Sequence, residues 1–142
     1  VADSFRGLPP PDAETWPADK GVDLSEVEAL AVSRPEVEAS FARYGLLDSQ
    51  VRFLEGWFAD TLPTAPIERL ALLRLDGDLY QSTWEALENL YPKLSVGGIL
   101  IVDDYGAFEP CRQAVEDYRA RCNISDVVVP VDWTGVWWQR TH

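Results

Sequence analysis

The residues best suited to chemistry in this chain of 142 amino acids are four aspartates that directly follow two apolar runs: Asp76, Asp78, Asp103 and Asp104. The runs themselves, Leu70–Leu75 and Ile99–Val102, are short and bounded by polar turns, which is typical of strands buried in a parallel sheet. Ligands of such sheets bind at the carboxyl ends of the strands. We therefore expect all four carboxylates to share one edge of the sheet.

Gathering carboxylates at one edge has an electrostatic cost that predicts a cation. Two carboxylates about 4 Å apart repel by roughly 4 kcal/mol at an effective dielectric constant of 20. A few hard oxygen ligands, with room left for water or a substrate oxygen, favour Mg²⁺, with Mn²⁺ as the second choice. Zn²⁺ prefers His and Cys, and the one histidine is His142.

Three other interpretations of these acids remain open. A single Asp at the end of a strand often caps the turn or helix that follows it. An Asp-Gly-Asp triplet also occurs in calcium-binding loops, but the later acids of that loop are missing from Leu79–Thr83. A metal-dependent hydrolase of phosphates or esters could use clustered aspartates as well.

The remaining patterns predict an α/β fold of strands alternating with helices. One helix begins at Ser33-Arg34-Pro35-Glu36 and ends at Gly45. The other predicted elements are a strand at Val51–Leu54, helices at Tyr80–Tyr91 and Cys111–Cys122, and strands at Val127–Val129 and Val136–Trp138 around a turn from Asp132 to Gly135. We expect one domain, residues 1–142, with a mostly parallel sheet covered on both faces and a C-terminal antiparallel hairpin.

Two segments between or beyond these elements are open to more than one interpretation. The proline-rich stretch Gly7–Asp12 predicts a surface loop or lid outside the core. Near the end, Trp133, Trp137 and Trp138 are expected to pack in the core of the hairpin. The alternative is that these tryptophans line a substrate face or a subunit contact.

Composition excludes several classes of partner. The net charge of −12 should repel phosphate backbones and anionic lipids, so neither nucleic acid nor a membrane surface is expected to bind. No apolar run is long enough to span a bilayer, and no export signal is evident. Cys111 and Cys122 would lie about 16 Å apart along one helix, too far for a disulfide. We interpret them as buried thiols of a cytoplasmic protein.

Several motifs of this sequence resemble those of the macrocin O-methyltransferase family, in the same order and at the same spacing. They are Asp3–Pro9, Gly56–Pro63, Leu75–Tyr80, Tyr91–Leu94, Gly97–Gly98 with Asp103–Tyr105, Cys111–Arg112, Ala114–Val115 and Asp132–Trp133. The resemblance implies a Rossmann-like class I methyltransferase sheet with a terminal hairpin. It also implies a bacterial enzyme that uses S-adenosylmethionine and a divalent metal to methylate a sugar hydroxyl of an antibiotic or similar glycosylated small molecule.

The same resemblance assigns roles to particular positions. The metal ligands fall on Asp76, Asp103 and Asp104, and the general base falls on Asp78. The cofactor-binding positions are Asp3 and Ser4, at the end of the second strand of the family's fold, and Gly56-Trp57, which would border the adenine. The loop at residues 8–22 would contribute to the choice of the acceptor.

The family's first strand, glycine turn and helix should lie before Val1, so we expect the chain to lack that strand-turn-helix. An alternative is therefore a non-catalytic remnant or interaction module that keeps the fold but not the cofactor. Family members commonly associate, which predicts a homo-oligomer.

Overall fold

The computed structural model describes all 142 residues, and they form two compact units. Unit 1 consists of Val1–Pro11 and Gly21–Ala65, and unit 2 consists of Asp12–Lys20 and Pro66–His142. The segment Asp12–Lys20, which we call the strap, thus interrupts the sequence of unit 1 and packs with unit 2. No helix is long and apolar enough to cross a membrane.

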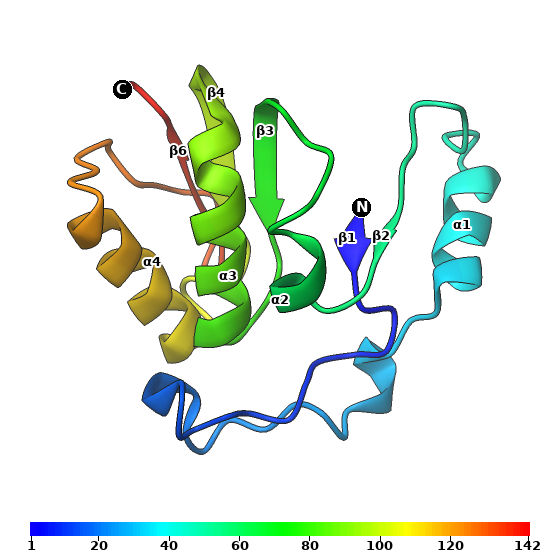
Figure 1. Cartoon of the computed structure of the whole chain (residues 1–142), viewed down its shortest axis with the longest axis horizontal. Helices are drawn as coiled ribbons and strands as arrows, with labels where there is room; N and C mark the ends of the chain where they lie inside the picture. The colour runs from blue at the N-terminus through cyan, green and yellow to red at the C-terminus, as the bar shows by residue number, and fades with distance from the viewer. The chain divides into compact units, whose positions relative to one another are not determined.

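Unit 2 contains a four-stranded sheet in the order β3-β4-β6-β5 (Figure 1). The strands are β3 (Leu70–Leu75), β4 (Leu94–Val102), β5 (Val129–Pro130) and β6 (Val136–Gln139). Only β3 and β4 pair in parallel, while β6 runs antiparallel to both β4 and β5. The predicted hairpin is confirmed, but the prediction of a mostly parallel sheet is wrong for unit 2, because the hairpin supplies half of its strands.

The two long helices of unit 2 cover one face of this sheet. They are α3 (Tyr80–Leu90), followed by a 3₁₀ turn at Tyr91–Lys93, and α4 (Glu109–Arg121). Alternate strand residues face these helices and are buried: Leu73, Leu75, Leu100, Val102, Val136 and Trp138. Trp138 is fully buried, with its ring near Tyr91 and under the guanidinium of Arg119. The core of unit 2 lies between this face and the helices.

Most predicted elements of unit 2 are found with small changes at their ends. Strand β4 begins at Leu94 rather than Ile99, and α3 ends one residue before Tyr91. The two cysteines are free, as expected, yet Cys122 is exposed because α4 ends at Arg121 and the chain turns away there. The interpretation of both cysteines as buried is therefore right only for Cys111.

Unit 1 has less regular structure. A two-residue strand β1 (Ala2–Asp3) pairs in parallel with β2 (Leu54–Glu55), so the strand predicted at Val51–Leu54 is reduced to its last residue and the one after. Helix α1 (Arg34–Arg43) begins as predicted, with the Glu36 carboxylate accepting hydrogen bonds from Ser33 N and Oγ at 2.9 and 2.6 Å. A 3₁₀ turn at Glu28–Leu30 and the one-turn helix α2 (Phe58–Thr61) complete the unit.

Candidate active site

The first part of the site is the tight turn that joins β3 to α3. Its backbone folds back on itself, with Leu79 N donating to Gly77 O, and Asp78 has a φ of 55°, in the left-handed region that costs a non-glycine residue about 1–2 kcal/mol. Leu79 is buried and anchors the turn to the core. These constraints hold the Asp78 backbone in one orientation at the carboxyl end of β3.

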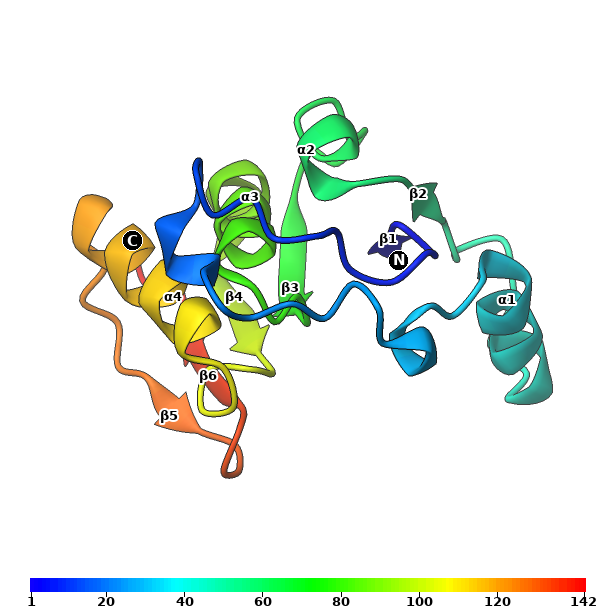
Figure 2. The same cartoon turned by 90° about the horizontal axis from the view of Figure 1, so that it is seen from below.

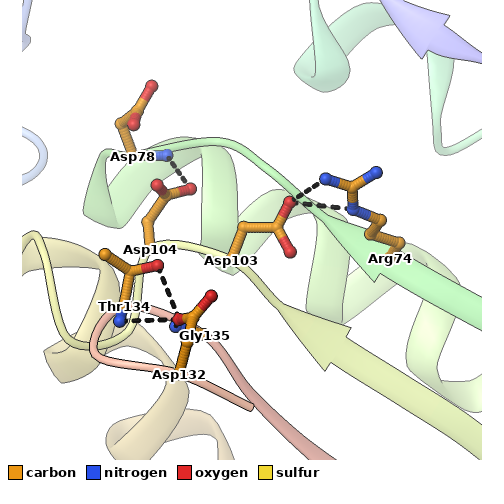
Figure 3. Close-up of polar contacts among 7 residues, drawn as sticks. All are labelled: Arg74, Asp78, Asp103, Asp104, Asp132, Thr134 and Gly135. Atoms are coloured by element: carbon orange, nitrogen blue, oxygen red, sulfur yellow. Dashed lines mark hydrogen bonds and ion pairs between the residues drawn. The ribbon is translucent and has the colours of Figure 1, made fainter.

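The second part follows β4, the parallel neighbour of β3. Asp103 N donates to Leu75 O at 3.0 Å, which extends the strand pairing, and Asp104 Oδ2 accepts from Asp78 N at 3.4 Å (Figure 3). Asp103 points the other way, and its Oδ2 accepts from Arg74 Nε at 2.8 Å. The predicted meeting of the two strand ends is thus confirmed for Asp78 and Asp104, while Asp103 is drawn toward a cation on β3.

A third part is a brace formed by Asp132–Gly135, the predicted turn between β5 and β6, whose contact with the aspartate loop the sequence did not reveal. Asp132 Oδ1 accepts from Thr134 N at 2.8 Å and Gly135 N at 2.7 Å (Figure 3). Thr134 O in turn accepts from Gly106 N at 2.7 Å, just beyond Asp104. A side chain on Gly106 would place its Cβ only 2.3 Å from Trp133 O, so the brace and the aspartate loop can meet only through glycine.

The brace also turns Trp133 away from the protein. The side chain of Trp133 is 83% exposed, so the expectation that it packs in the hairpin core is wrong. Trp138 is buried as expected, and Trp137 is half-buried on the opposite face of β6. The difference arises because Trp133 lies in the turn, outside the strand alternation that buries Trp138.

Burial and mutual repulsion change the acidity of this cluster. Burial, together with the charges of Asp104 and Asp76, raises the pKa of Asp78 to about 7. The pKa of Asp104 is also raised, chiefly by burial and then by the charge of Asp76, although the hydrogen bond from Asp78 opposes the shift. Like charges that share a partly buried site favour the neutral acid, and this explains both directions.

The predicted metal ligands are neighbours, but they do not converge. Asp76 and Asp103 both act electrostatically on Asp104, yet no group of three or more acidic, His or Cys side chains is arranged to hold a metal ion. The contact of Asp103 with Arg74 accounts for part of this, since it turns that carboxylate toward the guanidinium. Whether these residues bind metal stays a prediction.

The predicted cofactor positions lie together in unit 1. Asp3 and Glu55 are register partners, and Gly56 N donates to Asp3 O at 2.9 Å, so the ends of β1 and β2 place Asp3 beside Gly56. Asp3 is exposed, and its Oδ1 accepts from Phe5 N at 2.6 Å. The Ser4 hydroxyl is buried and donates to Gly7 O at 2.7 Å, so this side chain orders the turn. Trp57 is half-buried directly after Gly56.

A further residue that the sequence did not reveal is Asp19 in the strap. The surface loop predicted at Gly7–Asp12 does not extend to this position, because the Asp19 side chain is 0% exposed. Its two carboxylate oxygens accept from Tyr80 N at 2.6 Å and Gln81 N at 3.0 Å, at the start of α3. The sequence feature that could have pointed to such a residue is at the start of α3, where the N-cap residue Leu79 has no capping side chain.

Fold and site together define an α/β protein with an acidic cluster at the carboxyl ends of two parallel strands. The family model described as Macrocin-O-methyltransferase (TylF) matches residues 1–140. The chain is 56% identical over its whole length to the demethyldecarbamoylnovobiocin O-methyltransferase of Streptomyces niveus. It is 57% identical over 99% of its length to an 8-demethyl-8-(2,3-dimethoxy-alpha-L-rhamnosyl)-tetracenomycin-C 4'-O-methyltransferase of Streptomyces olivaceus.

The solved structure of the O-methyltransferase NovP superposes on the entire chain with a TM-score of 0.96 at 55% identity, and the match covers 59% of that structure's chain. The protein therefore belongs to the macrocin O-methyltransferase family, as its motifs indicated. The chain spans 55% and 54% of the length of the two curated relatives.

Proposed function

We propose that this chain is part of an S-adenosylmethionine- and Mg²⁺-dependent O-methyltransferase that acts on a sugar hydroxyl of a glycosylated secondary metabolite. The observation that carries the proposal is the meeting of Asp78 and Asp104 at the ends of two neighbouring parallel strands, with Asp76 and Asp103 beside them. We further propose that the parallel β3-α3-β4 unit is part of a Rossmann-like methyltransferase sheet. A homo-oligomer stays a prediction from the family.

The cluster has the chemistry of a site for a hard cation. Its donors are carboxylate oxygens, burial and then the charges of neighbouring aspartates raise the pKa values of Asp78 and Asp104, and Arg74 brings a positive charge to Asp103. Asp76, Asp103 and Asp104 would hold Mg²⁺ or Mn²⁺, with Asp103 turning from Arg74 to do so. The bound metal would supply Lewis acidity that lowers the pKa of the acceptor hydroxyl.

The residues of the chain then have separate tasks. Asp78 accepts the proton of the acceptor hydroxyl on a carboxylate oxygen, and its fixed backbone keeps that oxygen oriented. S-adenosylmethionine would supply the methyl group. In unit 1 the exposed Asp3 carboxylate suits the ribose hydroxyls as a hydrogen-bond acceptor, and Gly56, with a φ of 141°, leaves space where a side chain would clash with Thr61. The Streptomyces olivaceus relative is named for the 4'-O-methylation of a rhamnosyl-bearing tetracenomycin, which supports a glycosylated acceptor here.

Calorimetry with Mg²⁺, and separately with S-adenosylmethionine, tests the proposal. We expect the chain to bind Mg²⁺, and Asp103→Ala to lose that binding. Glu88→Gln, an exposed acid on α3 outside the cluster, is the matched control and should bind as the wild type does. Equal Mg²⁺ binding by Asp103→Ala and wild type would remove the metal site from the proposal.

Activity needs a second experiment because the chain spans little more than half of its relatives. Fused to the part of the S. niveus relative that it does not match, the chain should transfer a methyl group to a glycosylated acceptor, detected by mass spectrometry. The Asp78→Asn fusion should transfer at least about 100-fold more slowly, because a general base contributes about that much. Methyl transfer at the wild-type rate by this variant would exclude Asp78 as the base.

A further inference from the structure

The strap carries a buried carboxylate that none of the proposed catalytic steps uses. Asp19 is 0% exposed and lies in a 3₁₀ turn, Pro17–Asp19 (η1), while the residues on either side of it in the strap are more accessible. Burying an ionised carboxylate is costly unless its oxygens are hydrogen-bonded. An acid buried within an otherwise more accessible segment is therefore expected to make specific hydrogen bonds there.

That contact is the capping of α3. The first N–H groups of a helix have no partner within the helix, and the residue at the N-cap position usually supplies one. In α3 that residue is Leu79, which has no capping side chain. The Asp19 oxygens accept from Tyr80 N and Gln81 N at 2.6 and 3.0 Å, across 61 and 62 residues of sequence. The cap of α3 is therefore provided by the strap.

The strap is built to present this carboxylate. Asp12 Oδ1 accepts from Glu14 N and Thr15 N, each at 3.2 Å, and Trp16 N donates to Asp12 O at 2.7 Å, so the strap's first half is a closed turn. The Trp16 ring then packs against Tyr80 with 5.7 Å between centroids. In Figure 1 the blue turn η1 lies below the first turns of α3 and α4, and Figure 2 shows it from below.

The helix start that Asp19 caps is also the end of the turn that carries Asp78. Tyr80 follows Leu79 directly, and two residues before Tyr80 the backbone of Asp78 is held at a φ of 55°. A backbone in this region persists only when the surrounding structure fixes both sides of it. Asp104 holds Asp78 N on one side at 3.4 Å. Asp19 holds the other side, through Tyr80 and Gln81.

We infer that Asp19 is a positioning residue for the acidic cluster: by capping α3 from the strap, it keeps the Asp76–Leu79 turn in the conformation that holds Asp78 against Asp104, beside the carboxylates proposed to bind a divalent cation. The inference rests on the proposed function for the identity of the ligand. The part that concerns the conformation of the Asp76–Leu79 turn does not depend on that function. Residues that orient metal ligands from behind typically change metal affinity by 10–100-fold when altered.

The experiment compares Asp19→Asn and Asp19→Ala with Asp23→Ala, a matched control in which an exposed aspartate that caps its own turn at Ser25 is removed. Two quantities are measured on the chain: amide hydrogen exchange of residues 78–81, and Mn²⁺ affinity by electron paramagnetic resonance. Exchange at Val115, in the buried part of α4, shows that each variant is folded.

We expect exchange at Tyr80, Gln81 and Asp78 to be about 10-fold faster in Asp19→Ala, as loss of a cap predicts, with Val115 unchanged. Mn²⁺ should bind about 10-fold more weakly. Asp19→Asn, which keeps one acceptor oxygen, should lie between Asp19→Ala and wild type, and it serves as the test if the alanine variant does not fold.

Two results would overturn the inference: unchanged exchange at Tyr80 and Gln81, or faster exchange there with unchanged Asp78 exchange and Mn²⁺ affinity, which would make Asp19 a cap without influence on the site. A wild-type chain that binds no Mn²⁺ would instead defeat the proposed metal function. In that case the exchange rate of Asp78 alone decides whether Asp19 positions the turn.

Discussion

Unit 1 is the smaller of the two units of this protein, and the two units bury their side chains very differently. In unit 2 the sheet and two helices enclose a continuous core that ends in the fully buried Trp138. In unit 1 the helix α1 buries no residue, and the strands are two residues long. Large apolar side chains such as Tyr44 and Leu46 remain exposed there.

Helices with strong local start signals do not by themselves form a hydrophobic core. Helix α1 has the clearest start in the chain, with a capping box and an early proline, yet none of its residues is buried. Helix α3 has no local cap but buries five of its residues. Most helical stability in proteins comes from packing an apolar face rather than from local propensity, so we expect unit 2 to be the more stable unit.

The largest expected contrast comes from truncating one aromatic side chain in each unit. Trp138→Ala should destabilise unit 2 by about 3–5 kcal/mol, because the cavity left under α4 cannot be filled. Tyr44→Ala, at a side chain that is 70% exposed, should leave the stability of unit 1 nearly unchanged. Urea unfolding followed by amide exchange in each unit measures both, and equal losses would contradict the contrast.

A second contrast concerns pH, because the raised pKa values fall in unit 2. The pKa of Asp78 is about 7 in the folded protein, and its ordinary value, 3.8, applies after unfolding. Folding thus favours the neutral acid, so the contribution of Asp78 to stability is fully present below pH 3.8 and is lost as pH rises toward 7. Asp104 contributes in the same direction.

In chelator, the melting temperature of unit 2 should therefore fall by about 5 °C from this effect between pH 4 and pH 8, after allowance for the partial exposure of these groups. Asp78→Asn should flatten the profile. A wild-type profile in chelator that matches the Asp78→Asn profile would show that the cluster is not under repulsion.

A smaller contrast compares the same turn motif in the two units. Asp132→Ala releases the brace from Gly106 and should lower the melting temperature of unit 2 by about 3 °C. Asp48→Ala removes a similar bond, to Gln50 N at 2.7 Å, from an exposed loop of unit 1. We expect no measurable change there, and calorimetric scans of both variants provide the test.

The smallest expected effect lies on the exposed surface of α1. Glu38→Gln breaks an ion pair with Arg34 whose two side chains are 42% and 37% exposed. Such pairs contribute little, so the melting temperature should change by less than about 1 °C. A larger loss, seen by the same calorimetry, would mean that α1 contributes more to unit 1 than its exposure indicates.

Local patterns in the sequence were sufficient to find most elements of unit 2 and the meeting of Asp78 with Asp104. Strand ends and helical spacing carry that information, because β3 and β4 are neighbours joined by one helix. The same patterns failed for Val51–Leu54, where pairing with the two residues of β1 limits the length of the strand. They also failed for Trp133, which lies in a turn whose direction depends on Asp132.

Asp19, Arg74 and Gly106 could not be found from the sequence for a common reason. Each acts through a contact with a residue distant along the chain: Asp19 with Tyr80, Arg74 with Asp103, and Gly106 with Thr134. Periodicity and caps report neighbours within a few residues, so such contacts leave no local trace. The one local hint of these contacts is at Leu79, the N-cap position of α3, whose side chain cannot cap the helix.

The brace has a consequence for the order of events during synthesis of the protein. A ribosome makes the chain from its N-terminus, so Asp103 and Asp104 emerge before Thr134, which holds their loop, and before Trp138, which fills the core beneath it. Until β6 has been made, β4 has no partner on that side and exposes a strand edge. The aspartate loop therefore acquires its final shape only after β6 has been translated, and the nascent chain is most vulnerable to misassociation just before that moment.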